Sequence, residues 1–432
     1  MKKFAIWLLF ATALTPIILA PNLITFEIGG KITLIRGLAF GAILFTFLAM
    51  VLGKKNSERT ELLNKVSTVA KNPLFVAVIA QAALLLVSAA FAYDRSMAFF
   101  GEPFRAEGFL TLFAFTLISF LMALLFEKKQ WNLYFIFTWI VSLGIFIIEL
   151  SQAAGGVDRP EALIGNPIFL ASYYLFSIFV SGYLALLWKK AGKPGWAYGA
   201  LFSILLFVVG IFLTDTRGTI VAIFIALLCT LVLLAKFGVR TCMGTSIRFL
   251  AGSTLAVIAV FSGVFLTTRH SSFWQKIPGV DRLATTSLSE GTAASRIKFT
   301  QLSINGFFAD GGVTRLLFGW GWDNYVYFFQ QHYDPMIYHF EEKLTDRAHN
   351  KLADMLVMTG LLGFVTYVIT WFLLAKRAMG IVRNRLLLGT VTVFFIVAYF
   401  INNLFTFDVG VTYLGFYSMI AFIAFTYNEN VY

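Results

Sequence analysis

Apolar stretches of about 20 residues recur along the chain and are separated by short polar connections. A helix of this length crosses the hydrocarbon core of a bilayer. The pattern predicts twelve membrane-spanning helices, at residues 4–24, 34–53, 74–93, 108–126, 133–150, 167–188, 196–214, 219–236, 249–267, 353–374, 386–405 and 410–427. We therefore expect an all-α, polytopic membrane protein.

The first apolar stretch follows Lys2 and Lys3 and in this respect resembles a secretory signal peptide. Pro21, however, stands directly after the only plausible small-residue cleavage site, and the stretch is longer than the usual signal core. We expect it to be retained as the first membrane helix.

One connection, residues 268–352, is far longer than the others, and loops of this length inside a compact domain are usually functional. It is too polar to lie in lipid and too aromatic to be disordered. Residues 295–308 have the pattern of a short amphipathic helix, and 319–324 that of a turn. We therefore expect three segments: helices 1–9 in residues 1–267, a large helical external loop with the catalytic residues in 268–352, and helices 10–12 in 353–432.

The basic residues are distributed as expected for such a topology. If the amino terminus is cytoplasmic, 19 of the 34 lysines and arginines lie inside, against six in the short outer loops and nine in the long loop. This follows the positive-inside rule and predicts that both termini are cytoplasmic. The net charge of +12 is thus explained by topology, and no nucleic-acid partner is expected.

Composition and missing motifs narrow the chemistry. With 59% hydrophobic and 13% charged residues, the chain is too apolar for a soluble protein. Its two cysteines, Cys229 and Cys242, lack the spacing of a metal site or a disulfide framework. The sequence contains no Asp-x-Asp pair, no Gly-Lys-Ser/Thr phosphate loop and no dinucleotide fingerprint. Chemistry that depends on a nucleotide, a metal or another cofactor is not expected.

Polar clusters gather on the side that the topology predicts to be external. They lie at residues 101–108, 158–167 and 215–218, and in the long loop at Arg296 and at 346–350. Arginines in short external loops run against the positive-inside tendency. The simplest reasons are an anionic ligand or a nearby carboxylate.

Two side chains stand out in these clusters. Arg217 lies in a connector of about four residues, where its guanidinium could bind a phosphate, or could instead reach the lipid headgroups or pair with Asp215. His349 comes just before a predicted helix, with Asp346 three residues upstream; a helix amino terminus disfavours an imidazolium, so it could act as a neutral general base. The alternative is a surface histidine bonded to the loop.

A transporter is the main alternative of a different class. Transporters usually place ionisable groups or broken helices near the bilayer midplane. The predicted helix centres contain few polar interruptions, chiefly Gln81 and the pair Asn402 and Asn403. The pattern therefore disfavours transport.

Several short motifs occur in one order along residues 90–375. They are Gly165-Asn166-Pro167, Thr214-x-Thr216-Arg217-Gly218, Ser295-Arg296, Phe318-Gly319-Trp320-Gly321, Arg347-Ala348-His349-Asn350 and Thr359-Gly360-Leu361-Leu362-Gly363. In this order, with this helix count and a long loop in this place, the chain resembles the O-antigen ligase and polymerase superfamily of bacterial envelope glycosyltransferases.

The resemblance implies a GT-C-like glycosyltransferase of the bacterial inner membrane that acts in lipopolysaccharide biosynthesis. It would move a glycan from undecaprenyl diphosphate to an acceptor hydroxyl at the periplasmic face, with inversion and without a metal. The compact loop favours an O-antigen ligase, whose acceptor is lipid A-core. A protein O-oligosaccharyltransferase, an O-antigen polymerase and a lipid-linked glycan transporter are the alternatives.

The resemblance also implies roles for individual residues. His349 is similar to the family's proposed catalytic base, and Arg217 and Arg296 to the arginines that hold the diphosphate. The expected donor- or acceptor-binding residues are Arg105, Arg159, Asn166, Arg347 and Asn350. Ile168 stands where a second asparagine often follows the Asn-Pro pair.

Overall fold

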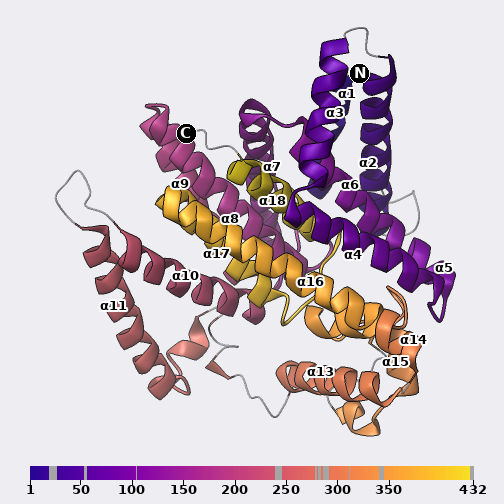
Figure 1. The fold of residues 1–432 in the computed structure, drawn as a ribbon. Coiled ribbons are helices and arrows are strands. Elements are labelled where there is room, and N and C mark those ends of the chain that lie inside the picture. The colour runs from indigo at the N-terminus through magenta and orange to yellow at the C-terminus, as the bar shows by residue number, and fades with distance from the viewer. Residues whose placement is uncertain are drawn as a thin grey trace. The chain divides into compact units, whose positions relative to one another are not determined.

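The computed structural model describes residues 1–18, 27–52, 56–103, 105–238, 246–277, 280, 284–285, 291–310, 312–339 and 345–428. Cys242, Phe104 of the first polar cluster and parts of the long connection lie outside these residues. In the described part of the chain the regular structure is helical (Figure 1).

The structure assigns the following helices, in chain order: α1 (Lys2–Ala11), η1 (Thr12–Ile17), α2 (Glu27–Leu52), α3 (Asn56–Ala70), α4 (Pro73–Ala90), α5 (Arg95–Phe100), α6 (Phe109–Leu125), α7 (Lys128–Ala154), α8 (Pro167–Lys190), α9 (Pro194–Leu213), α10 (Arg217–Phe237), α11 (Ile247–Thr268), η2 (Trp274–Lys276), α13 (Gly291–Ala309), α14 (Val313–Phe318), α15 (Tyr325–Gln331), η3 (Pro335–His339), α16 (Lys351–Asn384), α17 (Leu386–Asn402) and α18 (Gly410–Asn428).

Eight helices in the described residues are long and apolar enough to cross a membrane: α2 from Gly30 onward, α4, α7, α8, α9, α10, α11 and α16. Three more, α6, α17 and α18, are apolar but shorter. The prediction of a polytopic, all-helical membrane protein is confirmed. The count of twelve stays a prediction, because the first expected span runs into residues outside the described part.

The chain divides into two compact units. Unit 1 comprises Met1–Val141, Leu288–Leu374 and Asn403–Tyr432, and unit 2 comprises Ser142–Ser287 and Ala375–Asn402. Each unit has its own packing.

In unit 1, α6 packs against α2, α4 and α18. Buried residues lie on all sides of α6, as expected for a helix that is hydrophobic all round. Beside it, the fully buried ring of Trp131 meets Phe126 and Phe422 edge-on, with centroid distances of 5.2 and 5.3 Å. Aromatic side chains thus fill the centre of this bundle.

A break in α16 receives the glycine-tryptophan turn of the long connection. Gly360 has φ +66° and ψ −173°, which interrupts the helix. The carbonyls of Val357 and Met358 therefore accept hydrogen bonds from the backbone N–H groups of Trp320 (2.9 Å) and Gly321 (3.0 Å). The two motifs that the sequence analysis found separately are thus one structural joint, near which α13, α14 and α15 gather (Figure 1).

In unit 2, most of α8 is buried, and it packs against α9 and α17, while α10 packs against α17. Asn402, the last residue of α17, joins this helix to α10 and α8 by side-chain hydrogen bonds. Its oxygen accepts from the Thr219 hydroxyl (2.6 Å), and its nitrogen donates to the Ser172 hydroxyl (2.9 Å). Such bonds between apolar helices each contribute roughly 0.6–2 kcal/mol. The polar interruption at Asn402 therefore has a packing role.

Candidate active site

The loop between α5 and α6 is closed tightly on itself in unit 1. Gly101 has φ +91°, and a Cβ there would lie 2.3 Å from the backbone nitrogen of Glu107, so only glycine fits. Arg36 of α2 donates hydrogen bonds to the carbonyls of Phe100 (2.6 Å) and Ala106 (2.7 Å). These contacts fix the loop that carries the first polar cluster.

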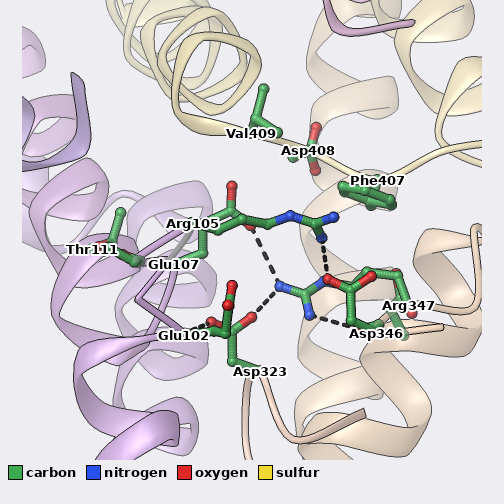
Figure 2. Close-up of polar contacts among 12 residues, drawn as sticks. Glu102, Arg105, Glu107, Thr111, Asp323, Asp346, Arg347, Phe407, Asp408 and Val409 are labelled. Carbon is green, nitrogen blue, oxygen red and sulfur yellow. Dashed lines mark hydrogen bonds and ion pairs between the residues drawn. The ribbon is translucent and has the colours of Figure 1, made fainter. Parts of the chain in front are cut away.

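Arg347 lies inside a cluster of acidic residues, with its side chain 3% exposed (Figure 2). It forms an ion pair with Asp323, and it donates hydrogen bonds to a carboxyl oxygen of Glu107 at 3.5 Å and to the backbone carbonyl of Asp346 at 2.8 Å. Burial raises the pKa of Glu107 to about 8, although the charge of Arg347 opposes the shift. Glu107 therefore keeps its proton at neutral pH, and Arg347 cross-links segments that are far apart in the sequence.

Arg105 lies beside this cluster and is more accessible, with a side chain that is 14% exposed. Its Nη1 is 2.8 Å from a carboxylate oxygen of Asp346, and its guanidinium lies 4.3 Å from the centre of the Phe407 ring (Figure 2). Burial alone would raise the pKa of Asp346, but the charges of Arg347 and Arg105 together lower it. Asp346 is thus the anionic partner of Arg105.

His349 is held between aromatic rings just before α16. Its ring lies 6.3 Å from that of Phe299 and 5.3 Å from that of Phe407. Its φ of +53° is a left-handed conformation that a residue with a side chain seldom adopts. Its Nδ1 is buried and has no hydrogen-bond partner within the described part of the chain. A buried imidazole nitrogen of this kind is costly unless a ligand completes it.

The electrostatic surroundings keep the His349 ring neutral. Burial, and next the positive charge of Arg296 on α13, lower its pKa to about 4; Arg105 and Arg347 act in the same direction, and Asp346 opposes them. The neutral ring was predicted from the position of His349 at a helix amino terminus, whereas burial and arginine charges are the causes in the structure. At pH 7 the ring is therefore unprotonated, as a general base must be, but with a pKa of about 4 it is a weak base.

The backbone around His349 is anchored on both sides. Asp354, in the first turn of α16, accepts a hydrogen bond from the backbone N–H of Ala348 (2.7 Å). The Asn350 oxygen caps the helix, and the Asn350 nitrogen donates to the Thr300 hydroxyl on α13 (3.4 Å). These bonds hold His349 in its left-handed conformation.

In unit 2, Arg217 is the first residue of α10, and Thr216 is the N-cap of this helix. Asp215 has φ +52°, so the connector between α9 and α10 turns sharply. Arg159, in the loop before α8, donates through Nε to the backbone carbonyl of Thr214 (3.1 Å). The two arginines are thus attached to the same short connector.

Asn166 begins α8 in the manner of an Asn-Pro helix start. Its side-chain oxygen accepts a hydrogen bond from the backbone N–H of Ile168 (2.9 Å), and Pro167 occupies the first helical position. Ile168 stands where a second asparagine often follows the Asn-Pro pair, and its backbone N–H is the donor to the Asn166 cap.

The predicted site residues are divided between the two units. Those in unit 1 are Arg105, Arg296, Arg347, His349 and Asn350. Those in unit 2 are Arg159, Asn166 and Arg217. Asp323 and Asp354 were not predicted from the sequence. An acidic residue in the first turn of a predicted helix was a usable signal for Asp354, whereas nothing local marks Asp323, whose partner is 24 residues away.

Comparison with known proteins identifies one part of the chain. Residues 201–368 match the family model described as O-Antigen ligase. No curated protein matches the chain. The matched segment contains Arg217, Arg296 and His349, and it confirms the resemblance drawn from the motifs.

Proposed function

We propose that this chain, a member of the O-antigen ligase superfamily, is an inverting glycosyltransferase that uses undecaprenyl diphosphate as the glycan carrier and no metal. The acceptor is a hydroxyl at the periplasmic face of a bacterial inner membrane, and lipid A-core is the first choice. One observation carries the proposal. In the matched segment, His349 is buried and neutral, the charge of Arg296 lowers its pKa, and its Nδ1 lacks a hydrogen-bond partner among the described residues.

In the proposed step, His349 takes the proton of the acceptor hydroxyl. The acceptor oxygen forms a bond to the anomeric carbon while the bond from that carbon to the diphosphate oxygen breaks. The electron pair leaves with undecaprenyl diphosphate, and the attack from the opposite side inverts the anomeric configuration. Arg296 stabilises the departing diphosphate, and one such electrostatic contact contributes about 3 kcal/mol to the transition state.

Arg217 is the second diphosphate-binding residue of the proposal. Its position at the start of α10 combines a guanidinium with a helix amino terminus, and both attract phosphate. It belongs to the other unit, so its action on the same diphosphate as Arg296 stays a prediction from the motif.

Donor binding would also raise the pKa of His349. The charge of Arg296 lowers the pKa of His349, and a diphosphate bound to that arginine offsets the charge. The pKa of His349 then rises toward neutral pH, where a general base is most effective. The histidine would thus be a weak base without donor and a stronger one with it.

The remaining predicted residues divide by their contacts. Arg105 is the most suitable donor- or acceptor-binding side chain of unit 1, since its side chain is partly exposed. The ion pair of Arg347 with Asp323 and the capping bond of Asn350 support positioning roles. We propose that Arg159 and Asn166 contact substrate through the loop before α8, in addition to the backbone contacts that they make.

The proposal is tested with His349→Ala in proteoliposomes that contain an undecaprenyl-diphosphate glycan and lipid A-core. Loss of a general base should lower the transfer rate by about 10²–10⁴-fold, while donor binding persists. The matched control is His270→Ala, which changes an exposed histidine outside the cluster. Transfer at the wild-type rate by the His349 variant would remove this residue from the mechanism, and translocation of the donor without transfer would favour a transporter.

A further inference from the structure

A groove runs along the solvent-facing side of α13 in unit 1. Its volume is about 440 Å³. Lys298, Gln301 and Asn305 line one wall at spacings of three and four residues, so they share one face of α13. His332 and Asp334, which follow α15, line the other wall.

The groove is built on fixed supports. The His332 ring stacks on Phe328 at 4.5 Å, its Nε2 lies 3.1 Å from a carboxylate oxygen of Asp310, and its Nδ1 lies 3.0 Å from a backbone carbonyl. The other oxygen of Asp310 accepts from the Trp320 indole nitrogen (2.7 Å). A Cβ on Gly306 would lie 2.8 Å from the ring of His332, so glycine is required for the two walls to approach this closely.

The polar groups in the groove suit a hydroxyl-rich ligand. The amides of Gln301 and Asn305 each offer donors and an acceptor, the Lys298 ammonium donates, and the Asp334 carboxylate accepts. A lysine and an aspartate balance each other, and His332 is paired with Asp310. Because the lining residues that the structure describes carry no net positive charge, the groove favours the neutral hydroxyls of a sugar over a phosphate.

The same helix connects the groove with the proposed base. On α13, the charge of Arg296 lowers the pKa of His349, and the hydroxyl of Thr300 accepts a hydrogen bond from Asn350. Asn305 lies nine residues beyond Arg296, which is about 13 Å along the axis of α13 and about half a turn around it, so the groove opens on the opposite side of the helix from the side that serves His349. A ligand that contacted both would have to pass around α13. A ligand that reached from His349 into the groove would therefore be an oligosaccharide.

We infer that the groove formed by α13 with the residues after α15 is a subsite for an oligosaccharide, which it holds by the sugar hydroxyls several residues away from the reacting bond. The inference rests on the proposed function for its choice of ligand. The sugar chain belongs either to the donor or to the acceptor, and the two sources share this chemistry.

Direct binding provides a test that does not depend on transfer. The probe is the oligosaccharide released from the lipid-linked donor by mild acid, and its binding to the full-length protein in detergent is measured by saturation-transfer NMR. The double variant Gln301→Ala, Asn305→Ala should weaken binding by about tenfold or more, since it removes several hydrogen bonds. Both side chains are exposed, so the fold should be retained, and Gln331→Ala on α15 is a matched exposed control.

Transfer kinetics then identify the source of the sugar chain. In the wild type, KM should fall as the glycan lengthens on the donor in one series of assays or on the acceptor in the other, and the double variant should lose that dependence with kcat unchanged. Asn305→Trp, which fills the groove, should behave in the same way. Wild-type affinity for the oligosaccharide in the double variant, or competition for the groove by inorganic pyrophosphate, would overturn the inference. A defect in the proposed function would show instead as inactive wild-type protein or as an active His349→Ala variant.

Discussion

Burial and the charge of Arg296 are the two largest causes of the low pKa of His349, and Arg296→Gln removes the second while it keeps a long polar side chain. In Arg296→Gln the imidazolium is less disfavoured, so the pKa of His349 rises. Transfer requires the neutral ring and is lost as pH falls through that pKa, so the acid limb of the kcat/KM profile should move to higher pH. kcat/KM reports the free enzyme, in which no diphosphate offsets the arginine.

The plateau rate of Arg296→Gln should also fall, by roughly a hundredfold if one electrostatic contact to the leaving group is lost. The position of the acid limb separates the two effects, since a change in diphosphate binding alone leaves it in place. Lys276→Gln removes an exposed positive charge elsewhere and should change neither quantity. An acid limb at the wild-type pH in Arg296→Gln would show that His349 is not the titrating base.

The sequence predicted His349 and Arg296 but not the way in which they are supported. Both lie in short motifs whose residue types indicate their chemistry. The pairing of Arg347 with Glu107 and Asp323 joins positions separated by 240 and 24 residues, and a single sequence contains no local signal for such contacts. The resemblance implied a substrate-binding role for Arg347, whereas nothing in the sequence indicated its burial beside Asp323 and Glu107.

The break in α16 shows how one backbone conformation joins two segments. A Cβ on Gly360 would lie 2.4 Å from the backbone carbonyl of Leu317, and a Cβ on Gly319 would lie 2.5 Å from the backbone nitrogen of Gly360. Both glycines have positive φ, so each close approach coincides with a conformation that favours glycine. Gly360→Ala should therefore destabilise the protein by on the order of 1–3 kcal/mol from backbone strain, and by more from the overlap.

Thermal unfolding in detergent would measure this loss, and Gly319→Ala should produce a similar one. Gly144, inside α7, is the matched control because a Cβ there meets nothing within 4 Å. Gly144→Ala should be neutral or stabilising by up to about 1 kcal/mol. If Gly360→Ala unfolded at the wild-type temperature, the joint between α16 and the turn at Trp320 would not contribute to stability.

Most helices that were predicted from hydropathy agree with the structure to within a few residues. The stretch expected at 196–214 is α9 (Pro194–Leu213), and that expected at 386–405 includes α17 (Leu386–Asn402). Length and apolarity suffice for such segments, because a bilayer imposes both. The helix α3 was not predicted, since it is polar. The break at Gly360 was not predicted either, since it lies in a continuous apolar run.

The arrangement of charge along the chain gives the prediction on which the proposed location depends. Basic residues concentrate in alternate connections, so the positive-inside rule places the long connection and the loop before α8 on the same, external side. Single cysteines test this in a variant whose native Cys229 and Cys242 are replaced by serine. Gln331→Cys reports on the long connection, and Val157→Cys, at an exposed position, reports on the loop before α8.

A membrane-impermeant maleimide should label both of these cysteines on intact spheroplasts. Lys129→Cys and Lys189→Cys, at exposed positions of the basic connections, should react only after the membrane is opened. The outcome bears directly on the chemistry, because Arg217 must face the same compartment as His349 to act on one diphosphate. If Val157→Cys and Gln331→Cys were labelled from opposite sides, Arg217 could not serve the reaction at His349, and Arg296 would have to stabilise the leaving group without it.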